Sequence, residues 1–499
     1  MKASAVLQQR RSGVLLHLSS LPGSPGNGDL GHDAFRFVDW LADAGFGVWQ
    51  MLPLGPTHSD GSPYQCLSVH AGDPRYINLA LLEEHGWLQP ASGQPDGSPE
   101  AGVVELRLRR LNEARVQFRA GGGELSMDGE GEAAEFRRRH RYWLEDFALY
   151  MALRREKGEQ PWWEWPAGER DRVPAALDQA RERLCDAMEQ VVFEQYLFFH
   201  QWDQLRRHGT ARGITFFGDM PIFVAHDSAE VWANRELFAI NEQGHAEAVA
   251  GVPPDYFSET GQFWGNPHYD WKRLEETGFD WWLRRLATQL ELFDFVRLDH
   301  FRGLAAYWSI PATAETAMEG HWEPAPGQAF LEAVSERFGQ VPLVAEDLGV
   351  ITEDVDALRE AFHLPGMKIL QFAFDSDAHN PYLPHHHVPN GVVYTGTHDN
   401  DTTVGWYTAL EPAIQARIAD YLGQPGEGMP WPLLRSALAS VAGLAILPMQ
   451  DLLGLDGGHR MNTPGVAEGN WQWRFEWDWL APELADRLAS LNRLYGRCD

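Results

Sequence analysis

Short apolar segments that end in polar residues recur along the chain and predict buried β-strands. Near-continuous apolar runs are typical of parallel strands that are covered on both faces. Eight such runs lie at 13–20, 47–55, 214–224, 293–301, 341–349, 366–374, 392–400 and 444–454. Helical patterns separate several of them. Strands that alternate with helices predict an α/β fold, a (β/α)8 barrel, whose chemistry gathers at the carboxyl ends of the strands.

The segment 32–45 illustrates the helical pattern. It places Phe37, Trp40, Leu41 and Ala44 on one face of a helix and ends at Gly45. We therefore expect an amphipathic helix between the first two strands.

The length of the chain predicts large insertions into the barrel. The chain has 499 residues, whereas a typical barrel of this kind needs about 250. We expect one catalytic unit over 1–499. One insertion, 56–213, follows the second strand and contains helical patterns, and another, 225–292, follows the third strand and contains an aromatic, proline-rich loop.

Charge and cysteine content exclude several classes of partner. The net charge is −30, from 41 basic and 71 acidic side chains, which argues against nucleic acid or an anionic membrane surface as a partner. The three cysteines are widely spaced and form no CxxC pair, so neither a disulfide framework nor a zinc site is expected. No apolar run approaches the roughly 18 residues of a membrane span. The N-terminal residues are interpreted as a first strand, and the predicted compartment is the cytoplasm.

Aromatic residues and histidines each allow two interpretations. The chain contains 21 tryptophans, and Trp162, Trp163, Trp165 and Trp264 lie beside Gly and Pro in predicted loops. Such rings can fill a core or stack on sugar rings. The three histidines 385–387 lie in a proline-flanked loop. Because adjacent side chains diverge, we expect a solvated loop there and no metal site.

Acidic residues end at least four of the predicted strands: Asp219, Asp299, Glu346 and Asp399. Arg297 shares a strand face with Asp299, so its guanidinium favours a charged carboxylate there. Glu346 follows the apolar segment "VPLVA", and desolvation by such neighbours raises a carboxyl pKa. One charged and one neutral carboxyl are what glycoside cleavage requires. Taken singly, these motifs are typical of a salt bridge or a helix start, and other carboxylate chemistry stays open.

Several motifs resemble a known family. "FFGDMPIFV", "VRLDHF", "VAEDLG" and "TGTHDN" resemble the conserved regions of the α-amylase clan. "SGVLLHLSSLPG", "WQMLPLGPT", "SPYQ" and "GVPPDYFSETGQFWGNPHYDW" are similar to the amylomaltases, the 4-α-glucanotransferases of glycoside hydrolase family 77. The resemblance runs from about Arg11 to about Trp477. It implies a (β/α)8 barrel without the C-terminal β-domain that is common in amylases.

The resemblance also implies an activity and a role for particular residues. Asp299 matches the nucleophile, Glu346 the acid/base, and Asp399 the acid that binds the 2- and 3-hydroxyls of the sugar. The other residues that match substrate-binding positions are Tyr64, Asp219, Arg297, His398, Trp264, Asn266 and Pro267. The implied ligands are maltooligosaccharides and α-1,4-glucans, no cofactor is implied, and the expected assembly is a monomer or a homodimer.

Two other functions remain open at this point, an α-1,4-glucan hydrolase of the same clan and a non-catalytic glucan-binding protein. The intact acids at three strand ends count against the second. A long aromatic loop over the cleft would favour transfer over hydrolysis by excluding water. We hypothesise that residues 251–268 form this loop and exclude water.

Overall fold

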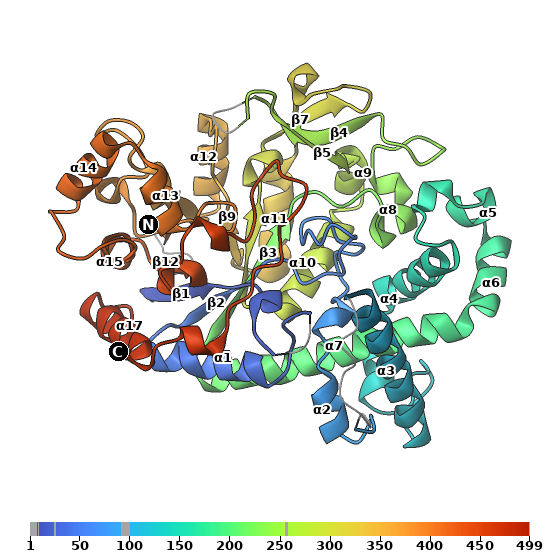
Figure 1. Cartoon of the computed structure of the whole chain (residues 1–499). Coiled ribbons are helices and arrows are strands. Elements are labelled where there is room, and N and C mark those ends of the chain that lie inside the picture. Colours follow the sequence, from blue (N-terminus) through green and yellow to red (C-terminus); the bar gives the residue numbers. More distant parts are fainter. Residues whose placement is uncertain (1–6, 8, 24–25, 91–99, 255–257, 499) are drawn as a thin grey trace.

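Eight parallel strands form the centre of the structure, a computed structural model that describes residues 7, 9–23, 26–90, 100–254 and 258–498 (Figure 1). The order of the strands is β10-β11-β12-β1-β2-β3-β6-β9. The two outer strands of this order approach each other where the amide of Ala345 donates to the carbonyl of Pro365 at 2.8 Å. The strands are β1 (Arg11–Leu15), β2 (Val48–Gln50), β3 (Thr215–Pro221), β6 (Phe295–Asp299), β9 (Leu343–Ala345), β10 (Gly366–Ile369), β11 (Gly391–Tyr394) and β12 (Leu444–Pro448).

Each apolar segment that predicted a strand overlaps one of these strands, so the (β/α)8 barrel is confirmed. These segments are apolar along their length because each strand is buried on both faces of the ring. Phe217 and Phe295 belong to the cluster inside the ring and stack with their centroids 4.3 Å apart. Their neighbours Phe216 and Val296 belong to the larger core between the strands and the helices. Successive side chains therefore face opposite apolar layers.

Helices surround the ring and build the insertions (Figure 1). They are α1 (His32–Asp43), α2 (Leu79–Glu84), α3 (Glu100–Ala120), α4 (Glu132–Glu156), α5 (Ala167–Arg170), α6 (Pro174–Arg183), α7 (Cys185–Ala211), α8 (Ala229–Ala233), α9 (Trp271–Glu276), α10 (Asp280–Leu292), α11 (Gly327–Phe338), α12 (Glu353–Ala361), α13 (Thr403–Ala409), α14 (Pro412–Tyr421), α15 (Trp431–Ala439), α16 (Met449–Leu452) and α17 (Pro482–Leu494).

Helix α1 confirms the helix predicted over 32–45. Phe37 and Leu41 are fully buried, whereas Trp40 is only partly buried. The helix stops because Gly45 adopts a positive φ of 74°, which lets the amide of Phe46 bond back to the carbonyl of Leu41 at 2.9 Å. This is the Schellman pattern, in which glycine avoids the steric penalty of a left-handed residue.

The segment between β2 and β3 contains α2 to α7. The long helix α7 runs along the bottom of the view in Figure 1 beside α1, and α3 and α4 pack against it. The loop tryptophans of this segment are part of the packing: Trp162 and Trp165 are 0% and 3% exposed. Core filling is therefore the correct interpretation for these two rings.

A second sheet was not predicted. It is antiparallel, with the order β5-β4-β7-β8, and lies at the top of Figure 1. Its strands are β4 (Ala248–Val252), β5 (Gln262–Pro267), β7 (Ala306–Pro311) and β8 (His321–Pro324). The aromatic segment 251–268 is thus partly a β-hairpin, and its residues 255–257 lie outside the described part of the chain.

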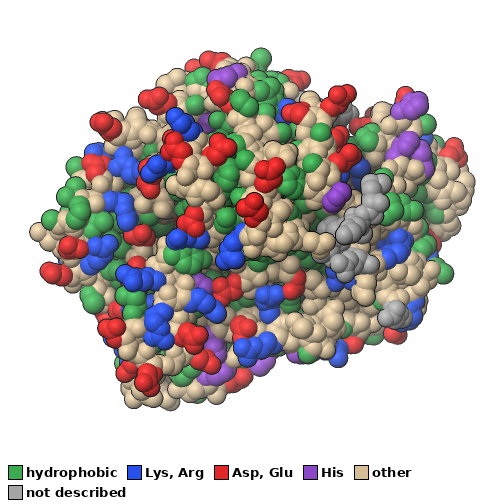
Figure 2. All heavy atoms as spheres, turned by 180° about the vertical axis from the view of Figure 1, so that it is seen from behind, with side chains coloured by type: hydrophobic (Ala, Val, Ile, Leu, Met, Phe, Trp, Pro, Cys, Tyr) green, Lys and Arg blue, Asp and Glu red, His purple; other side chains and the backbone are tan. Residues whose placement is uncertain are grey.

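The described residues after β12, 449–498, form helices, turns and coil and contain no strand. Within the described residues, no helix combines the length and apolar character that crossing a membrane requires. Figure 2 shows Lys and Arg side chains interspersed with Asp and Glu over the rear face.

Candidate active site

The predicted acids meet at one rim of the barrel. Asp219 lies in β3, Asp299 ends β6, Glu346 directly follows β9, and Asp399 lies in the loop after β11. Because the strands are parallel, their carboxyl ends share this rim, which is where barrels of this kind place their chemistry.

Arg297 joins two of the acids. Its Nη1 donates to both carboxylate oxygens of Asp219, at 2.8 and 2.7 Å, and its Nη2 donates to Asp299 Oδ1 at 2.7 Å. Burial alone would lower the pKa of the Arg297 guanidinium, but Asp219 and Asp299 hold that pKa well above its usual range. The predicted pairing of Arg297 with Asp299 is therefore present. Asp299 is the more open acid, since its side chain is 28% exposed whereas that of Asp219 is fully buried.

Glu346 is attached to the end of β6 through the main chain. Its amide donates to the carbonyl of Leu298 at 3.1 Å, and its carbonyl accepts from the amide of Phe301 at 3.2 Å. The side chain accepts from the amides of His300 at 2.7 Å and Leu348 at 3.1 Å. His300 follows Asp299 in the chain, so these bonds bring the Glu346 carboxyl to the side of Asp299.

The Glu346 carboxyl is strongly perturbed. Burial, reinforced by the negative charge of Asp299, raises its pKa to about 8, although Arg297 and the amide of His300 act in the opposite direction. This is the direction that the apolar sequence before Glu346 predicted. The group is therefore protonated at neutral pH and can donate a proton.

Asp399 has the opposite character. His398 Nε2 lies 3.3 Å from Asp399 Oδ2, and Asn462 Nδ2 donates to Oδ1 at 2.6 Å. Burial would raise the pKa of the Asp399 carboxyl, but His398, Asn462 and Arg297 together hold it well below its usual range. The side chain is 44% exposed. It therefore presents a permanent anion to whatever enters the site.

Aromatic rings surround the acids. Tyr64, which follows β2, stacks on His398 with centroids 5.2 Å apart and an interplanar angle of 16°. Its hydroxyl donates to Asp219 Oδ2 at 2.8 Å. The ring of Trp471 lies 6.0 Å from both Tyr64 and His398. Trp264 on β5 meets His300 edge to face at 4.9 Å. Flat apolar faces beside hydrogen-bonding acids are typical of sugar sites.

Asn266 and Pro267 lie at the base of the hairpin instead of among the acids. Asn266 is 5% exposed, and its amide nitrogen donates to the carbonyl of Val224 at 2.9 Å. Gln65 in turn donates to Asn266 Oδ1 at 3.3 Å. Pro267 pairs with Val249 of β4. These contacts fasten the hairpin that carries Trp264 to the loops after β2 and β3.

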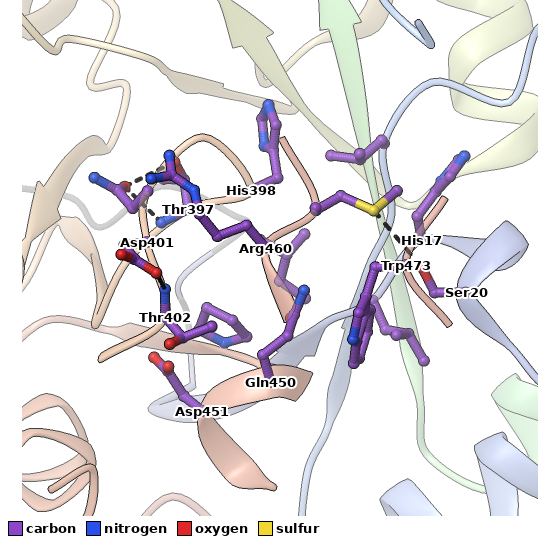
Figure 3. A pocket seen from close by; sticks show the side chains of 16 residues that line it. His17, Ser20, Thr397, His398, Asp401, Thr402, Gln450, Asp451, Arg460 and Trp473 are labelled. Atoms are coloured by element: carbon purple, nitrogen blue, oxygen red, sulfur yellow. Dashed lines mark hydrogen bonds between the residues drawn. The ribbon is translucent and has the colours of Figure 1, made fainter. Parts of the chain in front are cut away.

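The segment after β12 contains residues that contact the Asp399 loop and that the sequence did not reveal. Arg460 Nη2 donates to the carbonyl of Asp399 at 2.9 Å. The main-chain amide of Asn462 donates to the carbonyl of His398 at 3.2 Å. Figure 3 shows Arg460 beside Thr397 at one edge of a cavity, opposite Trp473. No periodic pattern marks this segment, and only its contact with the Asp399 loop indicates its role.

Asp451, in the short helix α16 that follows the last barrel strand, also fixes this loop. Its carboxylate accepts from the hydroxyls of Thr395 at 2.5 Å and Thr403 at 2.7 Å, and from the amide of Thr403 at 2.7 Å. The loop that carries Asp399 is therefore held by the buried Asp451 on one side and by Arg460 and Asn462 on the other.

The histidine run 385–387 has no features of a metal site. His385 and His386 are exposed, as expected of a solvated loop, but His387 is buried and pairs with Ser440 Oγ at 2.7 Å. In the described part of the chain, no group of three or more His, Cys, Asp or Glu side chains is arranged to hold a metal ion.

Comparisons with known proteins agree with this geometry. The family model described as 4-alpha-glucanotransferase, glycoside hydrolase family 77, matches residues 16–480. The 4-alpha-glucanotransferase of Thermus thermophilus is 49% identical over 493 residues, which cover 97% of this chain and 98% of that protein. The enzyme of the same name from Synechocystis sp. is 47% identical, and the match covers 99% of both chains.

Solved structures give the same result. The amylomaltase from Streptococcus agalactiae, solved in complex with acarbose, is 36% identical, has a TM-score of 0.92, and is matched over 98% of this chain and 100% of that one. The fold, the arrangement of acids and these relatives agree with the resemblance seen in the sequence. The chain therefore belongs to the 4-α-glucanotransferases of glycoside hydrolase family 77.

Proposed function

We propose that the chain transfers α-1,4-glucan segments between maltooligosaccharides by a double displacement that retains the configuration of the sugar. In the first step, an oxygen of Asp299 attacks the anomeric carbon and the bond to the leaving 4-oxygen breaks. Glu346 gives its proton to that oxygen. The products are a shortened glucan and a glycosyl ester on Asp299.

The second step reverses these roles. The Glu346 carboxylate takes the proton from the 4-hydroxyl of an acceptor sugar, whose oxygen attacks the anomeric carbon. The ester bond to Asp299 breaks, which restores both carboxyl groups and releases the elongated glucan. Asp399 remains ionised throughout and accepts hydrogen bonds from the 2- and 3-hydroxyls of the sugar.

The observation that carries this proposal is the contrast between neighbouring acids. Glu346 has a pKa of about 8, whereas Asp299 forms an ion pair with Arg297 at 2.7 Å. The bond from Arg297 goes to Oδ1 of Asp299, which leaves Oδ2 for attack. The amide of His300 bonds to Glu346 directly beside Asp299. This proximity supports the separation of about 5–5.5 Å that retaining enzymes need.

The residues around the acids offer surfaces on which the sugar can be positioned. Tyr64 offers a ring beside the acids, and Trp264 on the hairpin offers a second one. Arg297, Asp219 and His398 orient the acids and Tyr64 through the contacts described above. We propose that the barrel with its insertions, 56–213 and 225–292, acts as one catalytic unit over 1–499. Asn266 and Pro267 contribute by fixing the hairpin.

Replacing the nucleophile tests this assignment. In Asp299→Asn, disproportionation of maltotriose should fall by about 10⁴-fold or more, because no ester can form. Binding of maltotriose, measured by calorimetry, should remain. Turnover that survives in this variant would contradict the assignment of Asp299.

The product pattern separates transfer from hydrolysis. Maltotriose incubated with labelled glucose should yield longer oligomers that carry the label at the reducing end. Release of unlabelled glucose and maltose without longer products would identify a hydrolase. Binding without any product would identify the non-catalytic alternative.

We also propose that the protein functions in the cytoplasm. Cys66 and Cys185 form no disulfide, which agrees with a reducing compartment. The monomer or homodimer stays a prediction, which light scattering at several concentrations would test.

A further inference from the structure

One seam of the barrel, between β9 and β10, is only sparsely paired. These strands lie at the two ends of the strand order. Other neighbouring strands pair residue by residue, as β10 and β11 do. Among the described residues, the main-chain bond across the seam is the one from Ala345 to Pro365. Glu346 directly follows β9, so the proposed proton donor lies beside this seam.

The side chain of Asp347 crosses the seam. It is 6% exposed, and its Oδ1 accepts from the amide of Met367, the second residue of β10, at 2.6 Å. A carboxylate thus accepts a bond that a main-chain carbonyl accepts in a regular ladder. Bonds to a carboxylate are shorter and stronger than bonds to a neutral carbonyl. The residue directly after the proton donor is therefore fastened to β10.

Gly366, the first residue of β10, leaves the space for this carboxylate. A Cβ atom at position 366 would overlap Asp347 Oδ2, and the three heavy atoms nearest to it would all belong to the Asp347 carboxylate. Gly391 is its partner on β11. A Cβ atom there would meet the carbonyl oxygen of Val388 at 3.3 Å and no carboxylate. Glycine is therefore required at position 366 because Asp347 reaches across the seam.

An ion pair with Arg359 on α12 is the other contact of the Asp347 carboxylate. Arg359 Nε lies 3.3 Å from Asp347 Oδ2 but has no hydrogen-bond partner among the described residues. Arg359 also pairs with Asp356 at 3.2 Å and donates to the carbonyl of Leu364 at 3.3 Å. Because Arg359 has these other contacts, the attachment of α12 does not explain why Asp347 reaches β10.

The main chain of Glu346 is fastened on the opposite side, to the end of β6, through Leu298 and Phe301. With Asp347 bonded to β10, the segment 346–347 is held by both of its neighbours in the ring. A general acid must lie within hydrogen-bond reach of the oxygen that it protonates. A displacement of about 1 Å can lower a rate by about 10²-fold. The position of this segment therefore matters for catalysis.

We propose that Asp347 is a positioning residue for proton transfer, which holds Glu346 in place by joining the segment 346–347 to β10. It acts through Glu346 and not on the sugar. The proposal rests on the proposed function, in which Glu346 is the acid that protonates the leaving oxygen. It adds that the placement of this acid depends on a side chain that closes the barrel.

Two donors distinguish a positioning role from general damage to the fold. Asp347→Ala should lower kcat/KM for maltotriose by about 10–100-fold, because the proton donor is displaced. α-Maltosyl fluoride releases fluoride without prior protonation, so kcat/KM for fluoride release should fall by less than about threefold. Losses of the same size with both donors would show that Asp347 only supports the fold. An unchanged rate with maltotriose would also overturn the proposal.

Two further variants test the contact itself. Asp347→Asn keeps an oxygen that can accept from the Met367 amide, so it should recover most of the activity on maltotriose. A loss as large as that of Asp347→Ala would contradict the proposal. Gly366→Ala displaces the carboxylate without removing it and serves if Asp347→Ala does not fold. It should reproduce the loss that is selective for maltotriose, and equal losses with both donors would count against the proposal.

Gly391→Ala is the matched control for Gly366→Ala. It adds the same methyl group at the paired position of the neighbouring strand, away from the Asp347 carboxylate. The ratio of kcat/KM for the two donors should stay as in the unmodified enzyme. A selective loss with maltotriose in this variant would show that any strain in these strands disturbs proton transfer, and would overturn the specific role of Asp347.

The outcome can be separated from that of the proposed function. Glu346→Gln, measured with the same two donors, reports on the acid alone. If it loses both activities equally, the assignment of Glu346 is wrong. If it shows the selective loss with maltotriose but Asp347→Ala does not, Glu346 is the acid and the proposal for Asp347 is wrong.

Discussion

Two acids on the same rim, Glu346 and Asp399, lie in contrasting surroundings. Glu346 is bonded to the main-chain amides of His300 and Leu348, and the nearby anion of Asp299 adds to the effect of burial. Asp399 is bonded to side chains, those of His398 and Asn462. The pKa of Glu346 is raised and that of Asp399 is lowered.

The comparison shows that burial alone does not decide the protonation state of these acids. Desolvation disfavours the charged form of both carboxyls. The difference comes from the neighbours. A nearby anion keeps Glu346 protonated, whereas histidine, asparagine and arginine side chains keep Asp399 ionised. One barrel rim can therefore supply a proton donor and a permanent anion at the same pH.

Among the substitutions that would test the contrast between Glu346 and Asp399, Glu346→Gln should have the largest effect on activity. Loss of a positioned general acid should lower kcat/KM for maltotriose by about 10²–10⁴-fold. In the unmodified enzyme, Glu346 is protonated below its pKa, so donor cleavage should decline as pH rises through about 8. The variant has no such titration, and its residual pH profile should lack this alkaline limb. Initial rates measured from pH 5 to pH 10 would reveal the difference.

A donor with a better leaving group provides the control for Glu346→Gln. α-Maltosyl fluoride releases fluoride without prior protonation, so the first step should recover more with this donor than with maltotriose. Equal losses with both donors would argue that Glu346 has a structural role.

Asn462→Ala should have a smaller effect and acts on Asp399. One hydrogen bond to a charged group contributes about 1.5–3 kcal/mol, so we expect kcat/KM to fall by about 10–150-fold. The pKa of Asp399 should rise because a donor to its charged form is lost. The acid limb of the pH profile should therefore move to higher pH, while the alkaline limb of Glu346 stays in place.

Asn470→Ala is the matched variant for Asn462→Ala. Asn470 lies in the same segment and accepts from the amide of Thr463 at 2.9 Å, without a bond to Asp399. It should leave the acid limb unchanged. A comparable shift in both variants would mean that general loosening of the segment, and not the bond to Asp399, sets the titration.

The smallest expected effect concerns the hairpin that carries Trp264, whose ring lies beside His300. Replacing residues 253–261 by a short turn keeps β4 and β5 but shortens the connection between them. Water should gain access to the glycosyl ester, and the ratio of hydrolysis to transfer should rise severalfold. Product analysis with labelled glucose measures this ratio. Trp322→Ala, on the 37% exposed position of β8 in the same sheet, should leave it unchanged.

The barrel and its acids were predictable because both depend on local sequence. A strand buried on two faces must be apolar along its length, and a polar residue at its end is then conspicuous. "FVRLD" and "LVAED" show this pattern. The raised pKa of Glu346 followed from the same apolar neighbours, and the pairing of Arg297 with Asp299 followed from the alternation of side chains along a strand.

The small sheet and the residues after β12 were not predictable by the same reasoning. "AVAGV", "QFWGNP" and "HWEP" contain Gly and Pro, which sequence patterns associate with loops, and their partner strands are distant in the chain. Asn462 lies in coil. Its importance follows from the hydrogen bond that its Nδ2 donates to Asp399 Oδ1 at 2.6 Å, in a loop more than sixty residues earlier in the chain. Such roles arise only from the tertiary arrangement.

The amides that bind Glu346 have a consequence for how enzymes of this kind change over generations. Every residue except proline carries a main-chain N–H, so single substitutions at positions 300 and 348, other than those to proline, leave the donors of Glu346 in place. The donors of Asp399 are side chains, and one nucleotide change can remove each of them. Among related enzymes that differ in the pH at which they work, we therefore expect substitutions at positions 398 and 462.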